Sequence, residues 1–399
     1  MPIFSSGEME RRVSNLRKKM AENQIDCVIA SSYVGSYYYS GVPIHWFGRP
    51  LATIIPLEGE PAMVESMIEL EHTRTHTWIK DLRTYLDFNT TYSFENPKKP
   101  LESMVELVKE VITERNLTHS KIGIEGADIP LEHFKALKFA LPDAMFMDVS
   151  KTLATLRLVL SEEELRLVKA ADEIADLGLQ MLINTIVPRK NALEIELPVK
   201  KFMIETICER YPNIPFHLHA SSGLGSSDKT AGHSEWVTWN KQSIVMPGQL
   251  LETVVDVWMW GYWGNVERAI GIGKMKEEMR KPFEVMVEAN EAAIGAVKPG
   301  VFLSDIDRAA KDVLMKHGYQ TRTGTGCGRG ITSYEGNARE LLMDLRPYSD
   351  VVLQPGMAFS IEPDVREPGI GTFRHCNTII VTEDGCEVDS RTPRGVIWV

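Results

Sequence analysis

The sequence between Pro247 and Gly273 contains two apolar runs that meet at Trp260-Gly261. Two such runs joined by a two-residue turn are typical of a β-hairpin. Because successive side chains of a strand point to opposite faces, Trp263, Asn265 and Glu267 of the second run should share one face. The hairpin therefore predicts a sheet on which a carboxylate lies among aromatic side chains.

Tryptophans are concentrated around this hairpin, since five of the eight lie between residues 236 and 263. A tryptophan-lined pocket with one buried carboxylate is a good receptor for a planar organic cation. His233 precedes the hairpin and adds a side chain that can exchange a proton near neutral pH. The alternative is a structural role, in which the tryptophans belong to the core and Glu267 pairs with Arg268 or a lysine.

Length and composition indicate a large globular protein. The 399 residues predict two or three domains, and 43% hydrophobic with 25% charged residues is an ordinary composition. The apolar runs end short of about eighteen residues, so no transmembrane helix is expected. The N-terminus lacks a basic region followed by an apolar core, so we expect no secretory signal and a cytoplasmic location.

Cysteine usage and net charge indicate the redox compartment of the protein and the kinds of partner that it can bind. The five cysteines are an odd number without close pairs, which fits free thiols in a reducing compartment. The net charge of −11 is spread over the chain and argues against nucleic acid or an anionic membrane as a partner.

The order of expected elements predicts two domains. Helices and strands alternate up to about Asp148, which indicates a small α/β domain. A helix start follows, with Ser161 as its N-cap and Glu164 completing a capping box. We therefore expect an N-terminal domain over residues 1–155 and a C-terminal domain over residues 156–399.

The C-terminal part begins with long helices and a Gly/Ser-rich loop that carries His219 and His233, and it ends in a β-rich tail. The glycine cluster at 324–330 is not followed by Gly-Lys-Ser/Thr and does not open a helix, so a nucleotide-binding loop is not expected. Asp256, on the first strand of the hairpin, is expected in a structural salt bridge, and the alternative is that it is a third polar group of the pocket. His217 and His219 are expected to be loop or supporting residues rather than ligands.

Four motifs follow one another in an order that resembles a known family. They are G-Y-W-G-N-V-E-R in the hairpin, V-K-P-G-V at 297–301, L-Q-P-G-M-A-F-S-I-E-P at 353–363, and F-R-H-C-N-T-I-I-V-T-E-D-G at 373–385. Together they resemble the pita-bread family of methionine aminopeptidase, aminopeptidase P, prolidase and creatinase. The first domain resembles that of the creatinase and prolidase branch. The resemblance implies an α/β (α+β) protein with a small N-terminal creatinase-like α/β domain and a C-terminal catalytic pita-bread domain.

The sequence departs from the peptidases of this family at their metal-binding positions. Those peptidases hold two divalent metals with two Asp, one His and two Glu, a set suited to hard cations. Matched by motif, the five positions fall on Val254, Asn265, Cys327, Glu362 and Cys376. A valine cannot coordinate a metal, and one carboxylate with a neutral amide cannot hold a pair of hard cations. We therefore expect no metal and no other cofactor.

Creatinase also lacks the metal, and the resemblance to it implies catalytic roles. Its catalytic histidine matches His233, and its two substrate-binding glutamates match Glu267 and Glu362. Its F-G-R-P loop, which reaches the substrate carboxylate from a partner subunit, matches residues 47–50 and implies a homodimer with a shared active site. The residues expected to bind the substrate are Phe47, Arg49, Trp263, Asn265, Cys327, His375 and Cys376.

Within this branch, the sequence resembles the enzymes that hydrolyse ectoine, a small zwitterion with a cyclic amidinium and a carboxylate. The implied reaction is metal-independent opening of the ring to N-acetyl-L-2,4-diaminobutyrate. His233 would act as base and then as acid, while Glu267 and Glu362 hold the cation. The residues leave two routes open, namely attack by water and direct attack by Glu267 on the amidinium carbon.

Other functions stay open at this point. The substrate could be a different guanidinium or amidinium carboxylate, or the chain could be a metallopeptidase for Xaa-Pro substrates. A mononuclear zinc site of Cys327, Cys376, His375 and Glu362 is a further hypothesis, although the thiols lack the sequence spacing of zinc ligands. The last alternative is a non-catalytic binding protein. The presence of His233 and both glutamates argues against it and favours catalysis.

Overall fold

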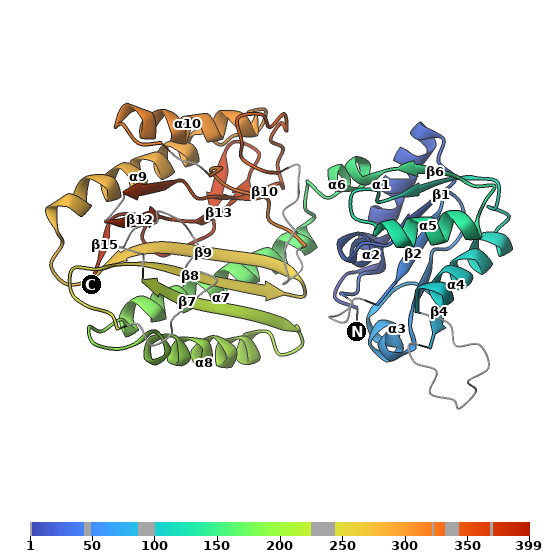
Figure 1. Cartoon of the computed structure of the whole chain (residues 1–399), viewed down its shortest axis with the longest axis horizontal. Coiled ribbons are helices and arrows are strands. Elements are labelled where there is room, and N and C mark those ends of the chain that lie inside the picture. The colour runs from blue at the N-terminus through green and yellow to red at the C-terminus, as the bar shows by residue number, and fades with distance from the viewer. Residues whose placement is uncertain are drawn as a thin grey trace. The chain divides into compact units, whose positions relative to one another are not determined.

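The computed structural model describes residues 2–43, 49–86, 100–224, 244–320, 323–331, 343–367 and 370–399, apart from the side chains of 100 and 221–224. The chain forms two compact units, an N-terminal unit, Met1–Arg157, and a C-terminal unit, Leu158–Val399 (Figure 1). Among the described residues, none of the helices is both long and apolar enough to span a bilayer.

The described part of the N-terminal unit is built on a mixed six-stranded sheet with the order β4-β3-β2-β1-β5-β6. Its strands are β1 (Cys27–Ala30), β2 (Ala52–Pro56), β3 (Ala62–Ser66), β4 (Asp81–Tyr85), β5 (Lys121–Ile124) and β6 (Met145–Asp148). Its helices are α1 (Ser6–Asn23), α2 (Tyr33–Ser40), the 3-10 turn η1 (Met67–Glu69), α3 (Leu70–His76), α4 (Pro100–Glu114), α5 (Leu131–Ala140) and α6 (Ser150–Leu156). Apolar side chains of α4 and α5 pack on the central strands. The predicted alternation of helices and strands is confirmed.

The C-terminal unit contains the predicted hairpin. Strands β8 (Leu250–Met259) and β9 (Tyr262–Gly271) pair along their whole length. Trp260 and Gly261 form the turn with φ of 51° and 81°, and two positive φ values are those of the tight turn that suits a twisted hairpin. Strands β7 (Phe216–Leu224) and β15 (Ile397–Trp398) flank the hairpin in the order β15-β9-β8-β7.

Further layers lie on the two faces of this sheet (Figure 1). Helices α7 (Glu162–Thr185) and α8 (Ala192–Arg210) bury an apolar face against it, and α7 begins with the predicted capping box of Ser161 and Glu164. The opposite face meets short strands that are covered by two helices (Figure 1). These elements are α9 (Glu277–Ala296), α10 (Leu303–Lys316), β10 (Ala358–Ile361), β11 (Asp364–Glu367), β12 (Gly371–Arg374), β13 (Asn377–Val381) and β14 (Cys386–Val388).

Helix α7 lies directly against β9 at Gly264. A Cβ atom at this position would lie 2.4 Å from the backbone nitrogen of Asp172 and 2.6 Å from the carbonyl carbon of Ala171. Glycine therefore lets the helix backbone rest directly on the strand. The contact also brings the Asp172 carboxylate to the strand, where its Oδ1 accepts the backbone N–H of Asn265 at 3.0 Å.

Candidate active site

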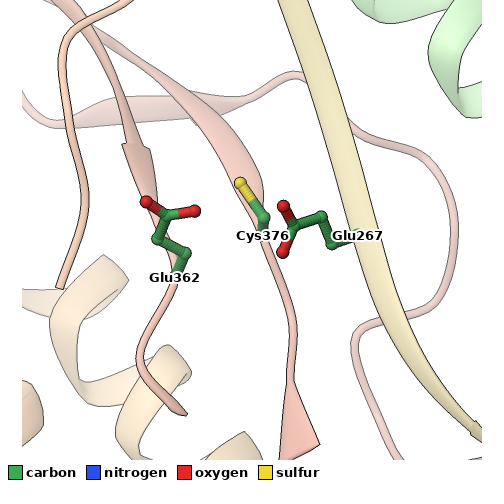
Figure 2. A group of neighbouring side chains, drawn as sticks. All are labelled: Glu267, Glu362 and Cys376. Atoms are coloured by element: carbon green, nitrogen blue, oxygen red, sulfur yellow. The ribbon is translucent and has the colours of Figure 1, made fainter. Parts of the chain in front are cut away.

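Strand β9 meets the segment between β12 and β13 through Glu267 and Cys376. Their backbones form an antiparallel bridge, with N···O distances of 3.3 Å and 3.1 Å. Glu362 follows β10 and points to the same place, so that the Cys376 thiol lies between the two carboxyl groups (Figure 2). One ligand atom of each of the three residues lies within 4.8 Å of the others. Three segments distant in sequence thus converge on one polar cluster.

The guanidinium of Arg374 joins the two glutamates of this cluster. It donates through Nε and Nη2 to both carboxylate oxygens of Glu267, the second contact being 2.5 Å. The same Nη2 lies 3.1 Å from Oε2 of Glu362. All three side chains are at most 14% exposed, so charge-assisted bonds here are only weakly screened.

Burial and charge perturb the acid–base properties of this group. Burial raises the pKa of Glu267 to about 7, the nearby Glu362 adds to the rise, and Arg374 opposes it. Burial disfavours the charged form of Arg374, but the two carboxylates outweigh it and hold the pKa of Arg374 above its usual range. Glu267 therefore titrates near neutral pH while Arg374 stays charged, a combination common at catalytic sites.

A second guanidinium, that of Arg329, fills the other side of the cluster. Its Nη2 donates to Oδ1 of Asn265 at 3.2 Å and contacts the thiol of Cys376 at 3.3 Å. Its Nη1 lies 3.8 Å from the thiol of Cys327, and its central carbon lies 4.1 Å from the ring centroid of Trp263. Arg329 is only 3% exposed, so its guanidinium is a fixed part of the site.

Asp256 bonds both to Asn265 and to the aromatic wall, which consists of the stacked rings of Trp258 and Trp263. Its Oδ1 accepts from Nδ2 of Asn265 at 2.7 Å and from Nε1 of Trp263 at 3.0 Å. Its Oδ2 lies 3.3 Å from Nδ1 of His219. The ring of Trp263 stacks on Trp258 with centroids 6.1 Å apart. The expectation that Trp263, Asn265 and Glu267 share one face is confirmed. Asp256 bonds to two of these side chains, and its contact with His219 is a salt bridge only when the imidazole is protonated.

The buried Asp172 and the partly buried Asp389 lie next to this network. Asp172 accepts from the hydroxyl of Thr378 at 2.9 Å, and that hydroxyl in turn accepts from Nε of Arg329 at 3.2 Å. Burial raises the pKa of Asp172 well above its usual range, and Asp389 adds to the rise. Burial likewise raises the pKa of Asp389 to about 6. One proton shared by the two acids is consistent with both shifts.

The structure brings together most, but not all, of the expected site residues. Glu267, Glu362, Trp263, Asn265, Cys327 and Cys376 meet in the cluster described above. His375 does not join them: its Nδ1 lies 3.1 Å from the carbonyl oxygen of Arg394, and its ring edge faces Phe283. The four residues of the alternative zinc site are therefore not assembled.

The remaining expected site residues are Phe47, Arg49 and His233. Arg49 lies in the N-terminal unit, where its Nη1 is 3.7 Å from Oε1 of Glu69. Phe47 and His233 lie outside the residues that the structure describes.

Sequence reasoning missed Arg329, Arg374 and Asp172. The motif F-R-H-C contained a usable signal for Arg374, because residues two apart in an extended segment share a face. Arg374 should thus lie beside Cys376, and His375 should point away, as observed. Arg329 stands inside a glycine cluster, and Asp172 lies on a helix distant in sequence. Neither carries a comparable local signal.

Comparison with known proteins identifies the family. Residues 166–383 match metallopeptidase family M24, and residues 12–159 match the creatinase/prolidase N-terminal domain. The chain belongs to metallopeptidase family M24. It is an α/β protein with an N-terminal creatinase-like domain and a C-terminal pita-bread domain, as the sequence predicts.

Relatives match over nearly the whole chain. Creatinase from Bacillus sp. (strain B-0618) is 26% identical and covers 99% of this chain and 93% of its own length. An Xaa-Pro dipeptidase from Lactobacillus helveticus is 25% identical, with 96% of this chain and 97% of the relative covered. The solved prolidase of Pyrococcus horikoshii OT3 shares the fold with a TM-score of 0.77 at 21% identity, covering 97% of this chain and 100% of that chain.

The M24 family name implies a metal, and the donors of this chain do not fit one well. Asn265 offers a neutral amide that already bonds to Asp256 and Arg329, and Val254 on the neighbouring strand is a buried apolar side chain. The carboxylates of Glu267 and Glu362 share the guanidinium of Arg374. Hard divalent cations require several oxygen donors, and here those oxygens already hold a cation.

Proposed function

We propose that this M24 family protein is a hydrolase that cleaves a C–N bond of a small amidinium or guanidinium carboxylate without a metal ion. More specifically, we propose that the substrate is ectoine and that the product is N-acetyl-L-2,4-diaminobutyrate. The match to creatinase over 99% of the chain supports the general class. The choice of ectoine rests on the motifs of the sequence and on the compact aromatic wall.

The charge balance of the cluster carries the proposal. Arg329 lies on the other side of the cluster, against Cys376. With Glu267 ionised, Glu267 and Glu362 contribute two negative charges and Arg374 one positive charge, which leaves one negative charge uncompensated among these three residues. A substrate with a single delocalised positive charge would neutralise it. Such a cation would also favour the ionised form of Glu267, whose pKa burial raises to about 7.

The reaction requires that an oxygen nucleophile add to the amidinium carbon and that a ring nitrogen leave. When water attacks, one of its protons passes to His233, which returns it to the departing nitrogen as the ring C–N bond breaks. The oxygen becomes the amide carbonyl when its second proton is lost, and the released amine takes up that proton and becomes an ammonium group. When Glu267 attacks, its carboxylate oxygen bonds to the amidinium carbon, and the ring C–N bond breaks as protonated His233 gives a proton to the departing nitrogen. Water then cleaves the bond to Glu267 and releases the amide product and the free carboxylate. Both routes need Glu267 in its ionised form.

Arg49 is the proposed clamp for the substrate carboxylate, supplied by the partner chain of a homodimer. Its guanidinium is already placed near a carboxylate, that of Glu69, at 3.7 Å. A guanidinium can bind a substrate carboxylate through two parallel hydrogen bonds.

One assay panel tests the proposal. Purified protein is incubated with ectoine, hydroxyectoine, creatine and an Xaa-Pro dipeptide, with and without a chelator, and products are identified by mass. We expect ring opening of ectoine at a rate that the chelator leaves unchanged, and no turnover by His233→Ala with its fold intact. Cleavage of the dipeptide alone, abolished by the chelator and restored by a divalent metal, would instead identify an Xaa-Pro peptidase like its relatives.

A further inference from the structure

The cluster of Glu267, Glu362 and Cys376 has the spacing of a cation site. Its three ligand atoms lie within 4.8 Å of one another, and two carboxylates with one thiol are donors that bind zinc. Yet the positions beside these donors are taken by two side chains of the protein itself, Arg374 and Arg329.

Each donor of the cluster touches a guanidinium. Arg374 bonds to both oxygens of Glu267 and lies 3.1 Å from Glu362. Arg329 lies 3.3 Å from the Cys376 thiol through Nη2. A metal ion that used these donors would have to displace Arg374 and approach two permanent positive charges in a buried, weakly screened site.

The guanidinium of Arg329 has little room to move aside. It is held by Asn265, Thr378 and the thiols of Cys327 and Cys376, and it is covered on one face by Trp263. Arginine stays protonated at every physiological pH. The positive charge next to Cys376 is therefore permanent and fixed in position.

We propose that Arg374 and Arg329 are built-in cations that keep divalent metal ions out of this site, and that a zinc-binding site lies latent beneath Arg374. Arg374 acts here as a positioning residue, because it holds the two carboxylates in place of a metal ion. The inference does not rest on any substrate, since metal uptake is measured without turnover. Neutral variants that bind no zinc would leave the proposed hydrolase reaction untouched, whereas zinc in the native chain would also contradict its metal independence.

The test removes the charge of Arg374 and measures bound zinc. Arg374→Ala, Arg374→Gln, Arg374→Lys and the full-length native protein are incubated with zinc, freed of excess metal and measured by elemental content per chain. We expect zinc to rise from substoichiometric in the native protein to one ion per chain in both neutral variants. Arg374→Lys keeps the positive charge and should stay substoichiometric, which separates the effect of charge from that of added space.

Two controls locate the bound ion. Arg308→Ala removes an arginine that is 66% exposed and pairs with Asp305 on α10, so it should leave zinc content at the native level. Adding Cys376→Ser to Arg374→Gln should lose the zinc again. Guanidinium chloride at low concentration should compete with zinc in Arg374→Ala, because guanidinium refills the vacated place.

The zinc content of the variants and of the native protein decides whether the inference holds. Arg374→Gln keeps a polar side chain of similar length, so it provides the measurement even where Arg374→Ala does not fold. Neutral variants that stay as free of zinc as the native protein would overturn the inference. One zinc ion per native chain, lost on adding Cys376→Ser, would overturn it as well, since Arg374 would then not exclude the metal.

Discussion

Substituting Gly264 by alanine should damage both the fold and the site, because helix α7 rests on strand β9 at this residue. The added Cβ would lie 2.4 Å from the backbone nitrogen of Asp172, whereas ordinary contacts begin at 3.4 Å. The helix would have to move by about 1 Å, the difference of these two distances. The two nearest atoms belong to the backbone of helix α7, so no side-chain rotation can relieve the contact.

The expected magnitude follows from overpacking of a well-filled interior. Such insertions cost about 1–3 kcal/mol, and a backbone obstacle places Gly264→Ala at the upper end, about 3 kcal/mol. For a unit of the size of Leu158–Val399, this corresponds to a fall in Tm of roughly 6–12 °C. The moved Asp172 would also loosen its bond to the backbone N–H of Asn265, which is 3.0 Å in the native structure. Activity should therefore fall together with stability.

The assay compares Gly264→Ala with Gly295→Ala by urea and thermal unfolding. Gly295 lies in helix α9, and a Cβ atom there meets nothing within 4 Å. This control should gain about 0.5–1 kcal/mol from the better helix propensity of alanine. The reasoning would be refuted if Gly264→Ala stayed within about 0.5 kcal/mol of the native protein, the range of a neutral surface change.

Three further predictions concern charge and assembly. Glu267→Gln should lower kcat/KM by at least about thirtyfold, or ~2 kcal/mol. It should also abolish the rise of activity with pH through about 7 that the raised pKa of Glu267 predicts; native-like rates would assign the glutamate a structural role. Burial raises the pKa of Asp389 from 3.8 to about 6, so the folded chain binds the proton more tightly and stability should fall as pH rises from about 4 to about 6. Asp389→Asn should flatten that slope in urea titrations across this range. Mixing inactive Arg49→Ala with inactive His233→Ala chains should restore part of the activity, and mixed dimers that form but stay inactive would contradict a shared site.

The parts of the structure that local patterns determine were predictable. The hairpin, its turn at Trp260 and Gly261, and the common face of Trp263, Asn265 and Glu267 all follow from a two-residue period in a strongly apolar stretch. The start of α7 at Ser161 follows from a capping box of four residues. Each of these features depends on residues that are close together in the sequence.

Charge compensation in the site was not predictable in the same way. The sequence alternative paired Glu267 with its neighbour Arg268, but the strand sends that side chain to the opposite face, where it bonds to carbonyl oxygens of Thr392 and Pro393. The actual partner, Arg374, is 107 positions away. Buried charges need a partner, but the sequence alone does not say which arginine the fold delivers.

The two guanidinium groups also limit the chemistry that the site can perform. A peptide carbonyl is a neutral electrophile, and its hydrolysis needs a Lewis acid or a set of hydrogen-bond donors that stabilises the developing oxyanion. Here the oxygens that would hold a Lewis acid are bound to Arg374. The proposed amidinium substrate carries its own delocalised positive charge, which carboxylates can hold without a metal ion. Glu267 and Glu362, which share the single guanidinium of Arg374, would therefore suit the proposed cationic substrate better than a neutral peptide carbonyl.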